Sequence, residues 1–144
     1  MEFMEILESL PLTKILEIPL YLHNISAGFP SPADDYLDKN LDLNEFLIKK
    51  PAATFLVRVS GDSMIEAGIN DGDILIVDRS ITPQYGFIVI AVVDGEFTVK
   101  RFIQIGGKPF LKPENKRLQL IDISRIENFE ISGVVVHAIK CFPK

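Results

Sequence analysis

The chain has 144 residues, of which 47% are hydrophobic and 24% charged, a composition typical of a globular protein with one core. The net charge of −5 offers no basic field for phosphates and argues against direct nucleic-acid binding. A single cysteine, Cys141, excludes an internal disulfide, and no clean apolar run near the N-terminus suits a signal peptide or a membrane span, so we expect a cytoplasmic protein without a membrane anchor.

The N-terminal part of the chain reads as an arm and a linker. Residues 24–35 combine glycine, two prolines, serine and acidic side chains, which disfavour both a helix interior and a central strand. The apolar spacing within residues 41–50 predicts a short helix that Asp42 caps and Pro51 ends.

Short runs of β-branched and apolar residues dominate from Phe55 onward, and turn residues separate them, which predicts a mainly β fold. The predicted strands are residues 55–59, 74–77, 88–93, 97–102, 110–111, 118–121 and 134–139. We expect a compact, coiled antiparallel sheet or partial barrel. The predicted division is an arm and linker over residues 1–44 and a β domain over residues 45–144.

The Asp94-Gly95 pair predicts a two-residue hairpin turn, and this turn fixes a register. Val89 should then face Lys100, whose side chain shares a sheet face with Ala91 and Val93. An amine on such an apolar surface loses solvation, which disfavours its ammonium form and lowers its pKa from roughly 10.4. A neutral lysine is what a general base requires.

Ser63, in the run Ser60-Gly61-Asp62-Ser63-Met64, is the candidate nucleophile for that base. A serine hydroxyl becomes a good nucleophile only when a neighbouring group takes its proton. On pattern alone, a serine in a turn and a lysine near a strand end are more often structural, so a non-catalytic interpretation stays open.

Other polar residues are assigned no chemistry. His137 is expected to pack within a strand, His23 and Cys141 have no ligand partners at metal spacing, and Asp34, Asp35 and Asp38 lack the order of a calcium loop. We expect no metal and no cofactor.

Five ordered blocks resemble the LexA/UmuD family of self-cleaving Ser-Lys peptidases. The blocks are residues 60–64, 68–73, 88–91, 94–101 and 111–115. The resemblance implies that Ser63 attacks, that Lys100 is its base, and that the backbone N–H groups of Asp62 and Ser63 hold the oxyanion. It also implies cleavage in the linker between a small residue and glycine, which here is Ala27-Gly28.

The short arm before Gly28 has too few residues for a helix-turn-helix DNA reader, so the chain is similar to the polymerase-accessory branch of the family rather than to its repressors. That resemblance implies a homodimer, a trigger by the RecA filament on single-stranded DNA, and a shortened form that joins a UmuC-type polymerase for error-prone translesion synthesis. No sequence-specific DNA binding is expected.

Two other classes of protein are open. A non-catalytic interaction module would keep its arm indefinitely, and a signal-peptidase-like processing enzyme would share the Ser-Lys chemistry but act on membrane-delivered substrates. The absence of an anchor in the sequence argues against the second class.

Overall fold

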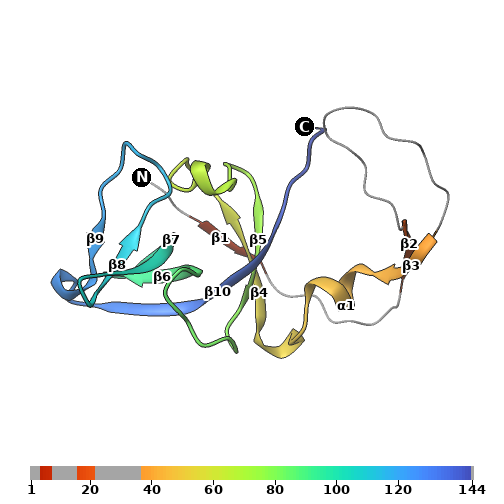
Figure 1. Cartoon of the computed structure of the whole chain (residues 1–144), viewed down its shortest axis with the longest axis horizontal. Helices are drawn as coiled ribbons and strands as arrows, with labels where there is room; N and C mark the ends of the chain where they lie inside the picture. The colour runs from red at the N-terminus through yellow and green to blue at the C-terminus, as the bar shows by residue number, and fades with distance from the viewer. Residues whose placement is uncertain (1–3, 8–15, 22–36, 144) are drawn as a thin grey trace. The chain divides into compact units, whose positions relative to one another are not determined.

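The computed structural model describes residues 4–7, 16–21 and 37–143 (Figure 1). The chain falls into two compact units, one of Met1–Leu10 with Lys50–Lys144 and one of Pro11–Lys49. The predicted linker at residues 24–35 lies outside the described residues. The division predicted between residues 44 and 45 stays a prediction.

The smaller unit contains a two-stranded antiparallel sheet of β2 (Glu17–Tyr21) and β3 (Leu37–Asp42), followed by α1 (Leu43–Leu47). The predicted cap is confirmed, because the Asp42 carboxylate accepts a 3.1 Å hydrogen bond from the Asn44 N–H. The helix begins directly after its predicted cap, but it ends at Leu47, earlier than the predicted stop at Pro51. Leu41 and Asp42 pair with β2 as the end of β3, and this pairing fixes them in an extended conformation.

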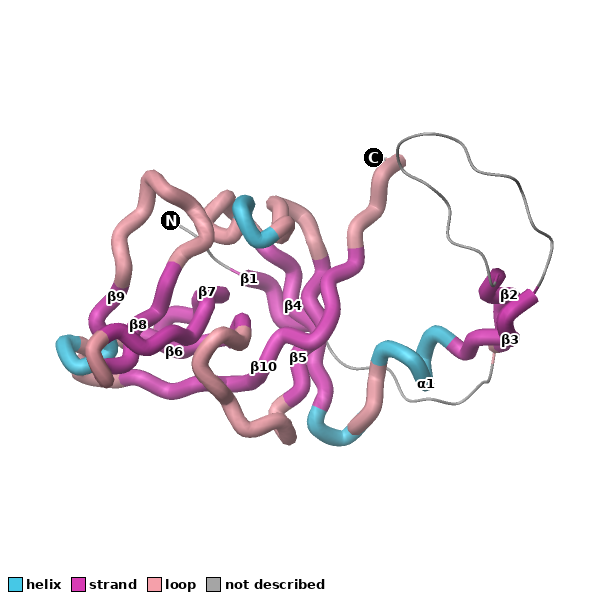
Figure 2. The backbone as a smooth tube through the Cα atoms, in the orientation of Figure 1, coloured by secondary structure: helices cyan, strands magenta, loops and turns pink. Residues whose placement is uncertain are grey.

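The larger unit is built on an eight-stranded sheet in which every pair of neighbours is antiparallel, so the mainly β prediction is confirmed (Figure 2). Its spatial order is β1-β4-β5-β10-β6-β7-β8-β9. The strands are β1 (Met4–Leu7), β4 (Thr54–Val59), β5 (Ile74–Asp78), β6 (Ile88–Val93), β7 (Glu96–Ile105), β8 (Lys108–Lys112), β9 (Ile121–Asp122) and β10 (Phe129–Ile139). Three short 3-10 helices lie between them, at Pro51–Ala53, Ile65–Ala67 and Ile123–Arg125.

The predicted strand at residues 118–121 is wrong except at its last residue. Only Ile121 pairs with β8, opposite Leu111. The Leu118 N–H instead donates a 3.0 Å hydrogen bond to the Asn115 carbonyl and closes a turn. Leu118 and Leu120 are exposed, so this apolar run lies in a loop rather than in the sheet.

The β6–β7 hairpin has the predicted register. Asp94 and Gly95 both have positive φ, 48° and 85°, as a type I′ turn requires. Val89 pairs with Lys100, Ala91 with Thr98, and Val93 with Glu96. The turn therefore places Thr98 and Lys100 on one face of β7.

The long strand β10 joins the two halves of the sheet, since its first half pairs with β6 and its second half with β5. Its register shifts between Ile131 and Gly133, where a Cβ atom would lie 2.6 Å from Cγ1 of Val77. Glycine is needed here for close packing. The main core cluster lies against β4 and β5 and includes Phe55, Val57, Val59, Met64, Ile69, Leu75, Val77, Ile90 and Val99.

Candidate active site

The turn that carries Ser63 joins β4 to the 3-10 helix at Ile65–Ala67 and is anchored on both sides of the serine. Before it, the Gly61 N–H donates a 2.9 Å hydrogen bond to the Asp71 carboxylate, and Gly61 has φ of 98°, which favours glycine. After it, the Met64 side chain is buried in the core. These two anchors hold Ser63, which is itself 5% exposed.

Lys100 reaches this turn from β7, with only 6% of its surface exposed. Its Nζ lies 3.2 Å from Oγ of Ser63, 2.6 Å from Oγ1 of Thr98 and 3.0 Å from the Val99 carbonyl oxygen. The structure thus brings together the two side chains that the sequence predicted as a pair.

The partners of Lys100 favour one orientation of its amine. A neutral amine has two N–H bonds and one lone pair, and the Thr98 hydroxyl and the Val99 carbonyl accept those two hydrogens. In that arrangement of the neutral amine, the lone pair is directed toward Oγ of Ser63, 3.2 Å away, as proton transfer from the serine requires. Because burial disfavours the ammonium form, the pocket supplies both the orientation and the environment for proton transfer from the serine.

A cleft of about 390 Å³ opens beside the pair. The Ser63 turn, the end of the β6–β7 hairpin and the loop before β9 form its walls. The lining residues are Gly61, Asp62, Ser63, Val93, Glu96, Phe97, Thr98, Lys100, Leu118 and Ile121. Its apolar side chains suit a short stretch of extended peptide that presents its backbone to Ser63.

The two residues whose N–H groups are predicted to hold the oxyanion, Asp62 and Ser63, both line this cleft. The predicted scissile pair, Ala27-Gly28, lies outside the described residues. His137 lies in β10 and is partly buried, and Cys141 is exposed after that strand. Within residues 4–7, 16–21 and 37–143, no group of three acidic, histidine or cysteine side chains could hold a metal.

No helix in the described part of the chain has the length and apolar character needed to cross a membrane.

Two side chains at the site had no role in the sequence prediction. Thr98 could have been found by alternation, since it lies two residues before Lys100 on the same strand face. Asn115 donates a 3.0 Å hydrogen bond from Nδ2 to the Asp62 carbonyl across a separation of 53 residues. No local pattern reveals a contact of that kind.

Comparison with known proteins agrees with this geometry. The profile of the Peptidase S24-like family matches residues 19–136. Protein MucA of Salmonella typhimurium is 46% identical over 136 residues, which cover 94% of this chain and 92% of MucA. Protein ImpA of the same species is 50% identical over 121 residues, covering 84% and 82% of the two chains. Protein SamA of Salmonella typhimurium strain LT2 is 44% identical over 119 residues, covering 83% and 84%.

The chain belongs to the Peptidase S24-like family. It is a UmuD-like SOS mutagenesis protein with a self-cleaving serine peptidase domain. The family resemblance seen in the five sequence blocks is confirmed. Three of those blocks, residues 60–64, 88–91 and 94–101, supply residues that line the cleft or pair with Lys100.

Proposed function

We propose that this protein cleaves its own Ala27-Gly28 bond with Ser63 as nucleophile and Lys100 as general base. The 3.2 Å contact between Nζ of Lys100 and Oγ of Ser63, buried at the edge of the cleft, is the observation that supports this proposal most strongly. The cleft adds support because it leads to Ser63, which is itself buried. The small residues Ala27 and Gly28 at the cut bond would let the arm approach that serine closely.

The reaction has two steps. In the first, Oγ of Ser63 attacks the Ala27 carbonyl carbon while Nζ of Lys100 takes its proton, and the N–H groups of Asp62 and Ser63 stabilise the oxyanion. The Lys100 ammonium then protonates the Gly28 nitrogen as the C–N bond breaks. In the second step, Lys100 removes a proton from water, which attacks the ester carbonyl, and the Lys100 ammonium then returns this proton to Oγ of Ser63 as the ester C–O bond breaks and the Ala27 carboxylate leaves.

We propose that the RecA filament on single-stranded DNA accelerates this reaction by favouring the conformation in which the arm lies in the cleft. Lys100 and Ser63 supply the chemistry, so slow spontaneous cleavage should also occur. The shortened product forms a homodimer and joins a UmuC-type polymerase for translesion synthesis.

Intact mass spectrometry tests the position and the trigger of the cut. The full-length chain incubated with RecA, single-stranded DNA and a nucleotide triphosphate should give two fragments that end at Ala27 and begin at Gly28. A matched reaction without DNA should give the same fragments more slowly. An unchanged mass in both reactions, or a cut at another bond, would contradict the proposal.

A further inference from the structure

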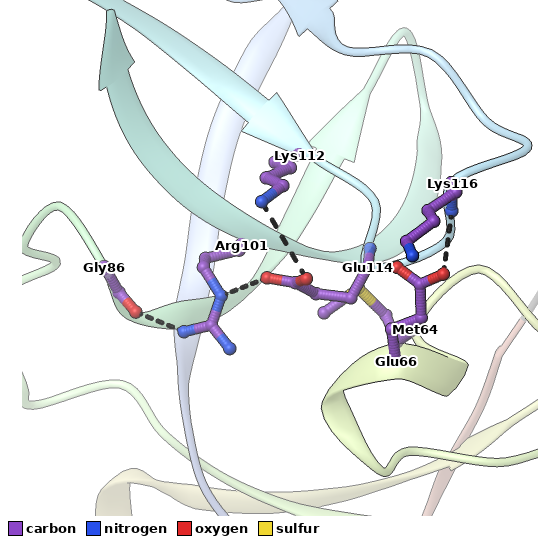
Figure 3. A network of polar contacts seen from close by, with 7 residues as sticks. All are labelled: Met64, Glu66, Gly86, Arg101, Lys112, Glu114 and Lys116. Atoms are coloured by element: carbon purple, nitrogen blue, oxygen red, sulfur yellow. Dashed lines mark hydrogen bonds and ion pairs between the residues drawn. The ribbon is translucent and has the colours of Figure 1, made fainter.

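The loop that follows β8 reaches back to the turn that carries Ser63. The Glu66 N–H donates a 2.8 Å hydrogen bond to the Glu114 carbonyl, and the Lys116 N–H donates a 3.1 Å hydrogen bond to the Glu66 carboxylate. The Glu114 N–H lies 3.4 Å from the Met64 sulfur (Figure 3). Residues 114–116 therefore contact Met64 and Glu66, which follow the nucleophile in the chain.

The same loop is also bonded to the strand of the base. The Glu114 carboxylate accepts a hydrogen bond from Nε of Arg101, which directly follows Lys100, and Nη1 of Arg101 donates a 2.6 Å hydrogen bond to the Gly86 carbonyl (Figure 3). The Glu114 side chain is mostly buried, with 15% exposed, so its pairing with Arg101 is shielded from solvent. One loop thus sets the position of the nucleophile turn relative to β7.

Asn115 lies at the centre of this loop and is buried, with 8% exposed. Both ends of its side-chain amide are bonded. Nδ2 donates to the Asp62 carbonyl at 3.0 Å, and Oδ1 accepts from the Arg117 N–H at 3.0 Å. These two bonds fix the orientation of the amide, because a flipped amide would place two oxygens against each other at Asp62.

The bond to Asp62 has a consequence for Ser63. The Asp62 carbonyl and the Ser63 N–H belong to one planar peptide unit and point in opposite directions. The carbonyl accepts from Asn115 and, at 3.3 Å, from the Ile65 N–H, so the direction of the Ser63 N–H is set by the same bonds.

We infer that Asn115 is a positioning residue for the oxyanion hole: it holds the Asp62–Ser63 peptide so that the Ser63 N–H stays aimed at the developing oxyanion. This inference rests on the proposed self-cleavage. Asn115 contacts neither the substrate nor Lys100 in this role, so its loss should slow the reaction without changing how the base titrates.

The test compares Asn115→Asp and Asn115→Ala in the full-length chain. Both substitutions remove the Nδ2 donor, and the aspartate keeps an oxygen for the Arg117 N–H. We expect the alkaline plateau of the self-cleavage rate to fall about 10-fold or more in both variants, less than the loss of a direct oxyanion donor. The midpoint of the rate–pH profile should be unchanged in Asn115→Ala, which adds no charge that would shift the titration of Lys100. Asn128→Asp is the matched control, because Asn128 is exposed and bonds Asp94 through its backbone.

A second measurement separates the oxyanion hole from docking of the arm. Diisopropyl fluorophosphate reacts with an activated serine and is too small to need the arm's binding contacts, but its transition state also places negative charge on an oxygen. Its reaction with Ser63 should slow in both Asn115 variants and not in Asn128→Asp. If the Asn115 variants slow self-cleavage but not the reaction of Ser63 with diisopropyl fluorophosphate, Asn115 acts in arm binding and the inference is overturned.

Two further outcomes are decisive. Wild-type plateau rates in a folded Asn115 variant, or a fall in rate accompanied by a shifted midpoint in Asn115→Ala, would overturn the positioning role. Ser63→Ala is measured beside them: if that variant cleaves, the proposed function fails, whereas if it is inert and both Asn115 variants cleave normally, only the inference about Asn115 fails.

Discussion

The Lys100 amine is surrounded by atoms that determine where its hydrogens point. Thr98 and Val99 accept two of them, and Ser63 lies on the remaining side. A base held in this way acts through its neutral form alone, so its titration should control the rate.

The rate of spontaneous cleavage should therefore rise with pH as the neutral fraction of Lys100 grows, and then level off once the amine is fully neutral. Acid should suppress cleavage, because a protonated lysine has no lone pair to accept the Ser63 proton. Rates at a series of alkaline pH values, on protein shown to be folded at each value, test this. A rate that does not depend on pH would remove Lys100 from the role of base.

At the residue scale, the sequence allowed the Ser63–Lys100 pair to be predicted and did not allow the Asn115 contact to be predicted. The hairpin turn at Asp94-Gly95 sets which face Lys100 occupies, and that is local information. The bond from Asn115 to Asp62 closes a loop between distant segments, and its existence depends on how the sheet folds back on itself.

At the element scale, β10 shows how one residue allows two halves of a sheet to meet. A Cβ atom added at Gly133 would lie 2.6 Å from Cγ1 of Val77, 3.4 Å from the Asp78 carbonyl oxygen and 3.5 Å from Cε1 of Phe55. The run of β-branched and apolar residues predicted a strand from residue 134, but the bulge and the earlier start at Phe129 depend on pairing with β6.

Gly133→Ala should destabilise the protein by about 1–3 kcal/mol, because the added methyl group overpacks a buried contact. Ser132→Ala, one residue earlier on the same strand, is the matched control and should change stability by about 0.5 kcal/mol or less. Urea unfolding followed by circular dichroism measures both. Equal midpoints for Gly133→Ala and the wild type would show that the core around Val77 accommodates the methyl group.

The loop at residues 118–120 illustrates the limit of pattern reading at this scale. Its leucines predicted a strand because apolar residues are usually buried, yet Leu118 lines the cleft and is 45% exposed. An apolar side chain kept at a cleft wall and one kept in a core have the same sequence signal.

At the scale of the whole molecule, the arm has enough length to enter more than one cleft. If fully extended, with the helix α1 unwound, the 23 residue steps from Gly28 to Pro51 would span on the order of 75 Å at ~3.3 Å per residue. Tethering raises the effective concentration of the arm to about the millimolar range, both at its own cleft and at that of a partner in a stable dimer. First-order kinetics would not distinguish these routes.

Mixed dimers distinguish them. In a heterodimer of a Ser63→Ala chain and a Gly28→Pro chain, the first subunit has a cleavable arm but no nucleophile. The second subunit has an intact Ser63 but a blocked cut bond. We predict that the Ser63→Ala chain is processed in such heterodimers, given a dimer interface near the arm. Dimers of wild-type chains provide the control, and an uncut Ser63→Ala chain in demonstrated heterodimers would confine the reaction to a single chain.

The most direct test of the central claim is the cleavage rate of Ser63→Ala and Lys100→Ala beside the wild type, followed by intact mass under alkaline conditions. Nucleophile and base act as a unit, so each single substitution should lower the rate on the order of 1000-fold or more, and the double substitution should be no slower than either. The circular dichroism of the sheet should be unchanged. Continued cleavage at Ala27-Gly28 in folded Ser63→Ala would contradict the account.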